Sequence, residues 1–355
     1  MNIKKQLWRL YPVSFKDKVF FAEHLRVMVR SGISLSDALK TLSAQTTNRR
    51  LKRILSQMKE NIEAGETLSD NLSRYPDIFS KTFISMVSAG EVSGTLEANL
   101  EELANQMRKE HQLRSRIKSA LAYPVIIILA TIAILIFLIT FVLPKMLDIF
   151  ESFQAQLPLP TKILIAVVKF AQNNGMLILT ITLITILSVI LFSKTKAGKK
   201  IFHKIFLIMP VTGPLAKQIN LARFSRTFSS LLKTDIPVVQ SLEITANTLS
   251  NVHYKKTVLE TAEEIKKGLN IAEVIGRYPN LFPPLVIQMI SVGEKSGNVD
   301  VLLKELADFY EEEIDNSTKS ISSIIEPLLI LFLGVIIGGI AIAVLLPMYT
   351  LTQQI

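Results

Sequence analysis

Gly90-Glu91-Val92-Ser93-Gly94 is repeated as Gly293-Glu294-Lys295-Ser296-Gly297, at an offset of 203 residues (293 − 90 = 203). The tripeptide Arg74-Tyr75-Pro76 returns as Arg277-Tyr278-Pro279 at the same offset. Single positions follow this shift without a gap, among them Phe21 and Phe224, Gly65 and Gly268, Phe79 and Phe282, Pro124 and Pro327, and Pro144 and Pro347. A gapless repeat of this length predicts a duplicated structural unit.

Each copy runs from a polar, helix-patterned region into a long uncharged stretch. The chain is 49% hydrophobic, and residues 119–144, 170–193 and 327–355 carry no charge. About 20 apolar residues in a helix cross a bilayer core, and a backbone in lipid must satisfy its own hydrogen bonds. We therefore predict an all-α membrane protein with two homologous cytoplasmic bundles, about six helices each, and three transmembrane helices.

Turn and cap signals divide the polar regions into short helices. Ser31-Gly32 indicates a helix end, Ser34 or Ser36 a cap of the next helix, Gly65 a C-terminal cap and Thr67 or Ser69 a further N-terminal cap. In the second copy Asp235-Ile236-Pro237 stands in place of Gly32-Ile33-Ser34. We expect the same turn there, built with different chemistry.

The distribution of lysine and arginine predicts the topology. Residues 108–118, before the first uncharged stretch, and 194–204, after the second, are rich in basic residues, whereas residues 145–170 have few. The positive-inside rule places both copies and the N-terminus in the cytoplasm. The N-terminal sequence has no apolar core and is not a secretory signal.

The predicted boundaries follow from these patterns. They are 1–14 for a basic N-terminal segment, 15–118 for the first bundle, 119–144 for the first span, 145–170 for an external loop or interfacial segment, 171–193 for the second span, 194–217 for a basic cytoplasmic linker, 218–322 for the second bundle, 323–347 for the third span and 348–355 for an external tail. Residues 158–172 fit either an extension of the second span or an interfacial helix.

The net charge of +10 raises the question of a nucleic-acid partner. The surplus lies in the first copy and beside the predicted membrane, where anionic lipid attracts basic residues. We therefore expect these basic residues to contact membrane lipids, and we expect no nucleic-acid partner.

Gly-Glu-x-Ser-Gly is the strongest short motif because it occurs twice. We expect Gly90 and Gly293 to end a helix, Gly94 and Gly297 to supply conformational freedom, and Thr95 or Asn298 to cap the following helix. The carboxylates of Glu91 and Glu294 would then lie near a helix N-terminus. A structural turn, which also includes Ser93 and Ser296, is the favoured interpretation, and a cytoplasmic contact surface is the alternative.

Three further features are candidates for interaction. Glu326 and Pro327 stand at the expected edge of the third span, where an acid is either interfacial or functional. Gly334 and Gly338 form a small-residue face that allows close helix packing. The acidic run 311–315 begins where the first copy has Arg108 and Lys109; it fits a solvated face, a cation site, or a surface through which the copies face each other.

Signals of catalysis are missing from the sequence. There is no phosphate-binding Gly-rich loop of the G-x-x-x-x-G-K-[ST] type, no G-x-S-x-G and no cysteine, and the four histidines are scattered without ligand spacing. We expect no catalytic residues, no cofactor and no metal, and hence a protein that is not an enzyme.

Taken together, the motifs resemble the inner-membrane platform proteins of type II secretion systems and type IV pili, the GspF/PilC family. The resemblance covers roughly residues 15 to 350 and rests on Phe21, Gly65, Leu68, Pro76, Phe79, Gly90, Glu91, Ser93, Gly94 and Leu96, on Phe224, Gly268, Ile271, Pro279, Phe282, Gly293, Glu294, Ser296, Gly297 and Val299, and on Tyr123-Pro124, Glu326-Pro327 and Pro347. It does not distinguish the pilus, secretion and DNA-uptake branches.

The resemblance implies a scaffold in the bacterial inner membrane that forms a homo-oligomer. It would bind a cytoplasmic hexameric assembly ATPase, pilin-like subunits and other inner-membrane assembly proteins, and couple ATP-driven motion to pilin or pseudopilin assembly and protein secretion. We hypothesise that Arg108, Lys109 and Arg114, together with the Gly-Glu-x-Ser-Gly turns, face the ATPase. A small oligomeric transporter or channel is the alternative.

Overall fold

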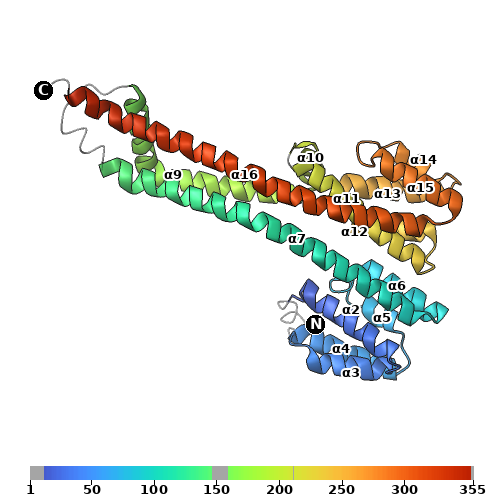
Figure 1. Cartoon of the computed structure of the whole chain (residues 1–355). Helices are drawn as coiled ribbons and strands as arrows, with labels where there is room; N and C mark the ends of the chain where they lie inside the picture. The colour runs from blue at the N-terminus through green and yellow to red at the C-terminus, as the bar shows by residue number, and fades with distance from the viewer. Residues whose placement is uncertain (1–11, 146–158, 211, 353–355) are drawn as a thin grey trace. The chain divides into compact units, whose positions relative to one another are not determined.

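The computed structural model describes residues 12–145, 159–210 and 212–352, and every regular element in these ranges is a helix (Figure 1). The predicted all-α fold is confirmed. Copy one comprises α2 (Phe15–Arg30), α3 (Leu35–Gln45), α4 (Arg49–Glu63), α5 (Leu68–Ser73), α6 (Lys81–Ser93) and the first part of α7 (Leu96–Phe137). Copy two comprises α11 (Thr212–Lys233), α12 (Val238–Thr248), α13 (Val252–Ile265), α14 (Ile271–Gly276), α15 (Pro284–Ser296) and the first part of α16 (Val299–Thr352).

The local signals place the helix ends where the sequence predicts them. The Ser34 side chain accepts from the Asp37 amide at the start of α3, and the Thr67 side chain accepts from the Asp70 amide at the start of α5. Gly65 and Gly268, which follow α4 and α13, have φ of 93° and 92°. These pairs of turns are therefore structural duplicates as well as sequence duplicates.

The turn at Asp235 preserves the geometry of its glycine counterpart. Gly32 has φ of 74°, and Asp235 has φ of 55°, the one positive φ outside glycine in the described residues. Asp tolerates the left-handed region better than most residues because its short polar side chain bonds locally. The expectation that different chemistry builds the same turn is confirmed.

Both copies bury the same aromatic pair. Phe21 and Phe79 are 1% exposed and their ring centroids lie 5.5 Å apart, while Phe224 and Phe282 are fully buried with centroids 5.4 Å apart. Copy two adds Tyr254, whose hydroxyl donates to the Leu281 carbonyl at 2.6 Å. Burial raises the pKa of the Tyr254 hydroxyl.

The chain divides into two compact units. The first contains both copies, up to Arg116 and again over His203–Asp315, and the second contains Ile117–Phe202 and Asn316–Ile355. Within the first unit, Leu231, Ile236 and Ile244 of copy two belong to the same buried apolar cluster as the core of copy one. The two copies thus share buried surface.

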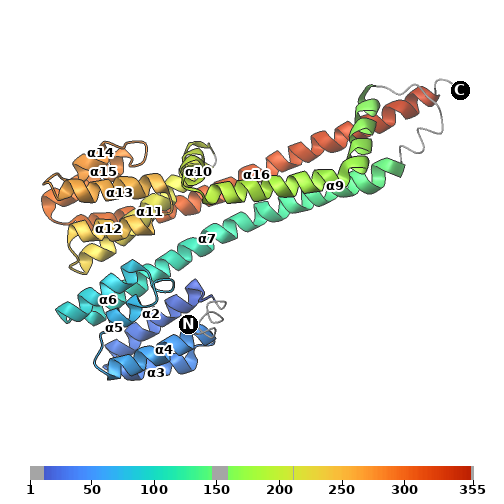
Figure 2. The same cartoon turned by 180° about the vertical axis from the view of Figure 1, so that it is seen from behind.

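The second unit contains the apolar helices. They are the rest of α7, which continues through a π-helical turn, η2 (Leu138–Val142), then α9 (Leu159–Lys194), and the rest of α16. Both α7 and α9 are long and apolar enough to cross a membrane, and Pro327–Ala343 of α16 forms a shorter apolar segment among the described residues. α9 bends at Asn174, where φ is −117° (Figure 2).

A third candidate span arises if α10 (Lys196–Ile208) and α11 are taken together as one broken helix, bent by 108°. The burial pattern of α11 assigns it to copy two instead, because Phe224, Phe228 and Leu231 are fully buried there. Among the described residues the structure therefore supports two candidate spans, in α7 and α9, and the apolar part of α16, Pro327–Ala343, is shorter than a span.

Packing within the second unit involves the start of α9. Thr161 donates from Oγ1 to the Ala343 carbonyl at 2.6 Å, and Val168 is buried against Leu143. Of the ambiguous segment 158–172, residues 159–172 are part of helix α9. Half of the predicted external loop, residues 146–158, lies outside the described residues, as does the end of the tail, residues 353–355.

Candidate functional site

The first glycine of the repeated motif is a site of close backbone approach. A Cβ at Gly90 would lie 2.8 Å from Leu96 Cα, and one at Gly293 would lie 2.9 Å from Val299 Cα. Neither glycine ends its helix, because α6 continues to Ser93 and α15 to Ser296. The expectation that the first glycine is the helix end is wrong: glycine is present because a second helix begins against it.

The second glycine of each motif ends the helix. Gly94 and Gly297 have φ of 73° and 74°, in the left-handed region that glycine adopts without a steric penalty. Before Gly94, the Ser93 hydroxyl donates to the Ala89 carbonyl at 2.7 Å. The predicted role of these two glycines as the flexible positions of the turn agrees with this geometry.

The motif glutamates cap helices, but not the ones that follow them. Glu91 accepts from the backbone amides of Leu68 and Ser69 at 2.5 and 3.0 Å, at the start of α5. Glu294 accepts from Ile271 and Ala272 at the same two distances, at the start of α14. The sequence indicated a helix N-terminus, and the structure places it 23 residues earlier in the chain, because α6 packs against α5 and α15 against α14.

These carboxylates are occupied within the fold. Each uses both oxygens on backbone amides that have no partner inside their own helix. The geometry supports the interpretation of Gly-Glu-x-Ser-Gly as a structural joint of three helices. The last three motif residues are exposed in both copies, and the third residue, which differs between the copies, is 87% exposed as Val92 in copy one.

An ion pair between the first and last helices of each copy is present with its charges exchanged. In copy one Glu23 of α2 accepts from Arg108 of α7 at 2.7 Å. The equivalent positions in copy two are Arg226 of α11 and Glu311 of α16 (226 − 23 = 203; 311 − 108 = 203), and their charged atoms also lie 2.7 Å apart. The first acid of the run, Glu311, therefore replaces an arginine of copy one, and Arg226 replaces the glutamate that pairs with it, so the ion pair is kept.

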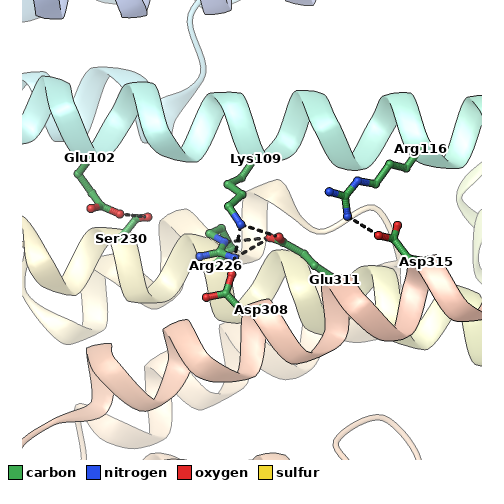
Figure 3. A network of polar contacts seen from close by, with 8 residues as sticks. All are labelled: Glu102, Lys109, Arg116, Arg226, Ser230, Asp308, Glu311 and Asp315. Carbon is green, nitrogen blue, oxygen red and sulfur yellow. Dashed lines mark hydrogen bonds and ion pairs between the residues drawn. The ribbon is translucent and has the colours of Figure 1, made fainter.

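The exchanged pair is also where the two copies meet. Lys109 of copy one reaches Asp308 at 3.3 Å and Glu311 at 3.2 Å, beside Arg226 (Figure 3). Arg116 bonds Asp315 at 2.5 Å further along the same helices. The possibility that opposite charges let the copies face each other is the one that agrees with the structure.

Electrostatics within this contact favour the charged forms. Burial acts to lower the pKa of Arg226, but its hydrogen bonds and ion pairs with Asp308 and Glu311 outweigh that effect and raise it. Burial acts to raise the pKa of Asp308, and the hydrogen bond from Arg226, with the charge of Lys109, lowers it instead. Both shifts favour the charged forms of Arg226 and Asp308.

A second set of contacts joins the copies on either side of this network. Arg223 of α11 reaches Glu110 of α7 at 3.0 Å, and Arg114 bonds the same carboxylate at 2.6 Å. Ser230 donates to Glu102 at 2.6 Å (Figure 3). Of the three basic residues proposed to face a partner, Lys109 thus joins the copies, while Arg108 and Arg114 make ion pairs within copy one and remain about half exposed.

A cavity of about 370 Å³ lies between the copies, and no sequence motif indicates it. Its lining includes Phe15, Lys18, Gln106 and Arg226. The pKa of Lys18 is lowered by burial, against the opposing charge of Asp77. Residues from both copies meet here only through folding, so no local pattern could have indicated it.

The candidates in the third span have different outcomes. Within the part of the chain that the structure describes, a Cβ at Gly334 or Gly338 would meet no atom within 4 Å, so this small-residue face is open there. Pro327 lies inside α16, and the Glu326 side chain lies outside the described residues. In the described residues, no group of His, Cys, Asp or Glu has the arrangement of a metal site.

Comparison with known proteins agrees with the duplicated architecture. A family model described as type II secretion system protein F matches residues 21–144 and again 224–347, which reproduces the offset of 203 residues (224 − 21 = 203). The chain is 33% identical to the type IV pilus assembly protein PilC of Myxococcus xanthus over 97% of its own length and 82% of the relative's.

Two other relatives represent both kinds of machine. PilC of Thermus thermophilus is 35% identical, and the type II secretion system protein F of Vibrio cholerae is 30% identical, each over 94% of this chain and 82% of the relative. With two matched domains and these relatives, the chain belongs to the type II secretion system protein F family, which includes the PilC proteins of type IV pili.

Proposed function

We propose that this protein is a non-enzymatic platform in the inner membrane of a type IV pilus or type II secretion machine. In this role it docks a cytoplasmic assembly ATPase and couples the motion of that ATPase to the assembly of pilin-like subunits. The observation that carries the proposal is the pair of family domains, joined to each other by ionic contacts and each continuing into an apolar helix.

The continuous helices supply a physical route for coupling. α7 has 42 residues and α16 has 54, and each begins inside a copy and continues into the apolar unit. Each of these helices is continuous from its copy into the apolar unit. A displacement imposed on either copy would therefore act directly on an apolar helix.

Topology is the first element of the proposal to test. The chain contains no cysteine, so single cysteines at Val92, in copy one, and at Lys162, in the predicted external segment, can be labelled selectively. A membrane-impermeant maleimide on intact spheroplasts should label Lys162→Cys and should label Val92→Cys after lysis alone. Labelling of Val92→Cys in intact spheroplasts would contradict a cytoplasmic copy one.

Docking is tested by crosslinking and affinity capture of the full chain from its native host. Recovery of an assembly ATPase and of pilin-like proteins supports the platform function. Arg108→Glu/Arg114→Glu should reduce ATPase recovery, because both side chains are half exposed on copy one. Lys40→Glu/Lys81→Glu, also on exposed positions of copy one, is the charge-matched control and should retain it.

Three results would contradict the proposal. One is undiminished ATPase capture by the Arg108→Glu/Arg114→Glu variant, which would remove this surface from the docking site. Another is capture of neither ATPase nor pilins by the unaltered chain. A third is solute flux through vesicles that contain the purified protein alone, which would favour the alternative of an oligomeric transporter or channel. The mass of the protein in nanodiscs tests the expected homo-oligomer.

A further inference from the structure

Helix α10, which connects α9 to copy two, has two chemically opposite faces. With 100° of rotation per residue, its four lysines fall on one arc: Lys196, Lys199, Lys200 and Lys204. The opposite arc carries Ile201, Ile205 and Ile208, followed by Met209, with side chains that are 45–70% exposed. Phe206, 49% exposed, lies beside Lys199 at the edge of this arc, and the half-buried Leu207 lies within the lysine arc. Such a helix is too polar to cross a bilayer and too apolar on one side for water.

The first half of α10 is held against the end of α9. One residue, Thr195, separates the helices, and its hydroxyl donates to the Phe192 carbonyl at 2.7 Å and accepts from the Gly198 amide at 3.0 Å. A Cβ at Gly198 would lie 1.9 Å from the Phe192 carbonyl oxygen, so this corner requires glycine. α10 thus begins where a candidate membrane span ends.

His203 fixes the rotation of α10 about its axis. The Val252 amide donates to His203 Nδ1 at 3.1 Å, and Asn251 donates from Nδ2 to the His203 carbonyl at 3.2 Å. On the helical wheel His203 lies within the lysine arc, about 160° from Ile205. The side that contacts copy two is therefore the polar side, and the apolar face is turned away from the copy.

We propose that α10 is an interfacial helix that binds anionic phospholipid. Its apolar face is immersed at the boundary of headgroups and acyl chains, and the flexible stems of its lysines let their ammonium groups reach lipid phosphates. Lipid is the occupant that fits both faces at once, because a bilayer surface offers apolar chains and negative charge side by side. Continuity with α9 places the helix at that surface.

The proposal depends on α9 crossing the membrane and not on ATPase docking. Each lysine near an anionic surface contributes about a fivefold preference for the bound state, from about 1 kcal/mol per residue. Removal of three lysines should therefore lower the ratio of immersed to exposed α10 by about 100-fold. Molar salt should produce a similar loss, because at 1 M salt the Debye length is about 3 Å and exposed charges that are farther apart than this are screened.

Fluorescent labelling of the full chain tests immersion directly. An environment-sensitive dye on Ile205→Cys is compared with the same dye on Val292→Cys, an exposed apolar position of copy two. The protein is reconstituted in vesicles of phosphatidylcholine, with or without phosphatidylglycerol. With phosphatidylglycerol, the dye at 205 should shift to the blue and be quenched by spin-labelled lipid, while the dye at 292 should do neither.

Lysine variants test the part played by charge. Lys196→Gln/Lys199→Gln/Lys204→Gln should remove the effect of phosphatidylglycerol, whereas Lys256→Gln/Lys295→Gln/Lys304→Gln, which removes the same charge from exposed positions of copy two, should keep it. Immersion that does not depend on phosphatidylglycerol would overturn the assignment of anionic lipid.

Two other outcomes would overturn the proposal. If the dye at 205 is as accessible to water as the dye at 292, the face is not immersed. If it is shielded from water but not quenched by spin-labelled lipid, protein covers the face, from a second copy or another partner. Either result together with normal ATPase capture would leave the platform function intact, so the two proposals fail separately.

Discussion

The carboxylate of Glu91 accepts a hydrogen bond from the backbone amide of Leu68 at 2.5 Å, and Glu294 makes the same bond to Ile271. In each copy, one side chain near the end of a helix caps the start of another helix 23 residues earlier. The duplication has therefore preserved a contact that is not local in sequence.

Loss of this cap should destabilise each copy. Glu91→Ala or Glu294→Ala leaves two helix-terminal amides without their acceptor and should cost about 1–2 kcal/mol. Hydrogen exchange at Leu68 and Ser69, or at Ile271 and Ala272, should accelerate in the matching copy alone. Glu60→Ala, at an exposed position, is the control, and equal acceleration there would refute the capping role.

A methyl group should not fit at the first motif glycine. Gly90→Ala or Gly293→Ala forces the backbone of the next helix to move, and overpacking of this kind costs about 1–3 kcal/mol. The midpoint of thermal unfolding should fall. Gly276→Ala is the matched control, because its Cβ would meet its nearest atom at an ordinary 3.8 Å. Equal midpoints for Gly90→Ala and Gly276→Ala would contradict the close approach.

Removal of the arginine should destabilise copy two more than copy one. Arg226 is 14% exposed and Arg108 is 46% exposed. Removal of the partly buried charge, Arg226→Gln, should cost about 2–3 kcal/mol, because hydrogen bonds to two charged partners are lost. Removal of the exposed one, Arg108→Gln, should cost less than about 1 kcal/mol.

A double exchange separates the pair from its surroundings. Glu23→Arg/Arg108→Glu should restore most of the stability lost in the single variants. Arg226→Glu/Glu311→Arg should not, because Asp308 and Lys109 would then face like charges. The thermal midpoints of the four single and two double variants provide the comparison, and full recovery in copy two would show that Asp308 and Lys109 exert no influence.

The contact between the copies should weaken in acid. The pKa of Asp308 is lowered in the fold, so its contribution to stability is fully present above the carboxyl pKa of the unfolded chain, about 4. That contribution is lost as the pH falls through the lower folded value. The stability of Asp308→Asn should lie below that of the unaltered protein at pH 7, begin to converge with it below about pH 4, and reach it below the folded pKa of Asp308. A constant difference would contradict the assignment.

Asp235 should be replaceable by the residue that its counterpart uses. A side chain at positive φ costs about 1–2 kcal/mol, whereas glycine adopts this region freely and loses about 0.5–1 kcal/mol in entropy. Asp235→Gly should therefore raise the free energy of unfolding by up to about 1 kcal/mol, and Gly32→Ala should lower it by a similar amount. Denaturant titration of both variants measures the two changes, and a loss of stability in Asp235→Gly would show that the aspartate side chain is required.

Several features of this protein could be predicted because they depend on near neighbours in the sequence. Ser34 and Thr67 each accept a hydrogen bond from the backbone amide three residues ahead, and Gly65 and Gly94 stand at helix ends. Long apolar runs form the candidate spans within α7 and α9. The motif glutamates do lie at helix N-termini, but at those of α5 and α14 and not of the helices that follow the motif. Spacing along one chain does not reveal which helix packs against which.

Sequence patterns are sufficient to predict the duplication, the helical class, the turns and the apolar helices, because periodicity, capping and hydrophobic length depend on residues that are close together in the chain. Tertiary structure alone decided that Glu91 caps α5, that Lys109 meets Asp308 and Glu311 across the copies, and that the apolar side of α10 is turned away from copy two. These contacts join groups that are tens to hundreds of residues apart in the chain. They stabilise the protein only after packing has brought the helices together.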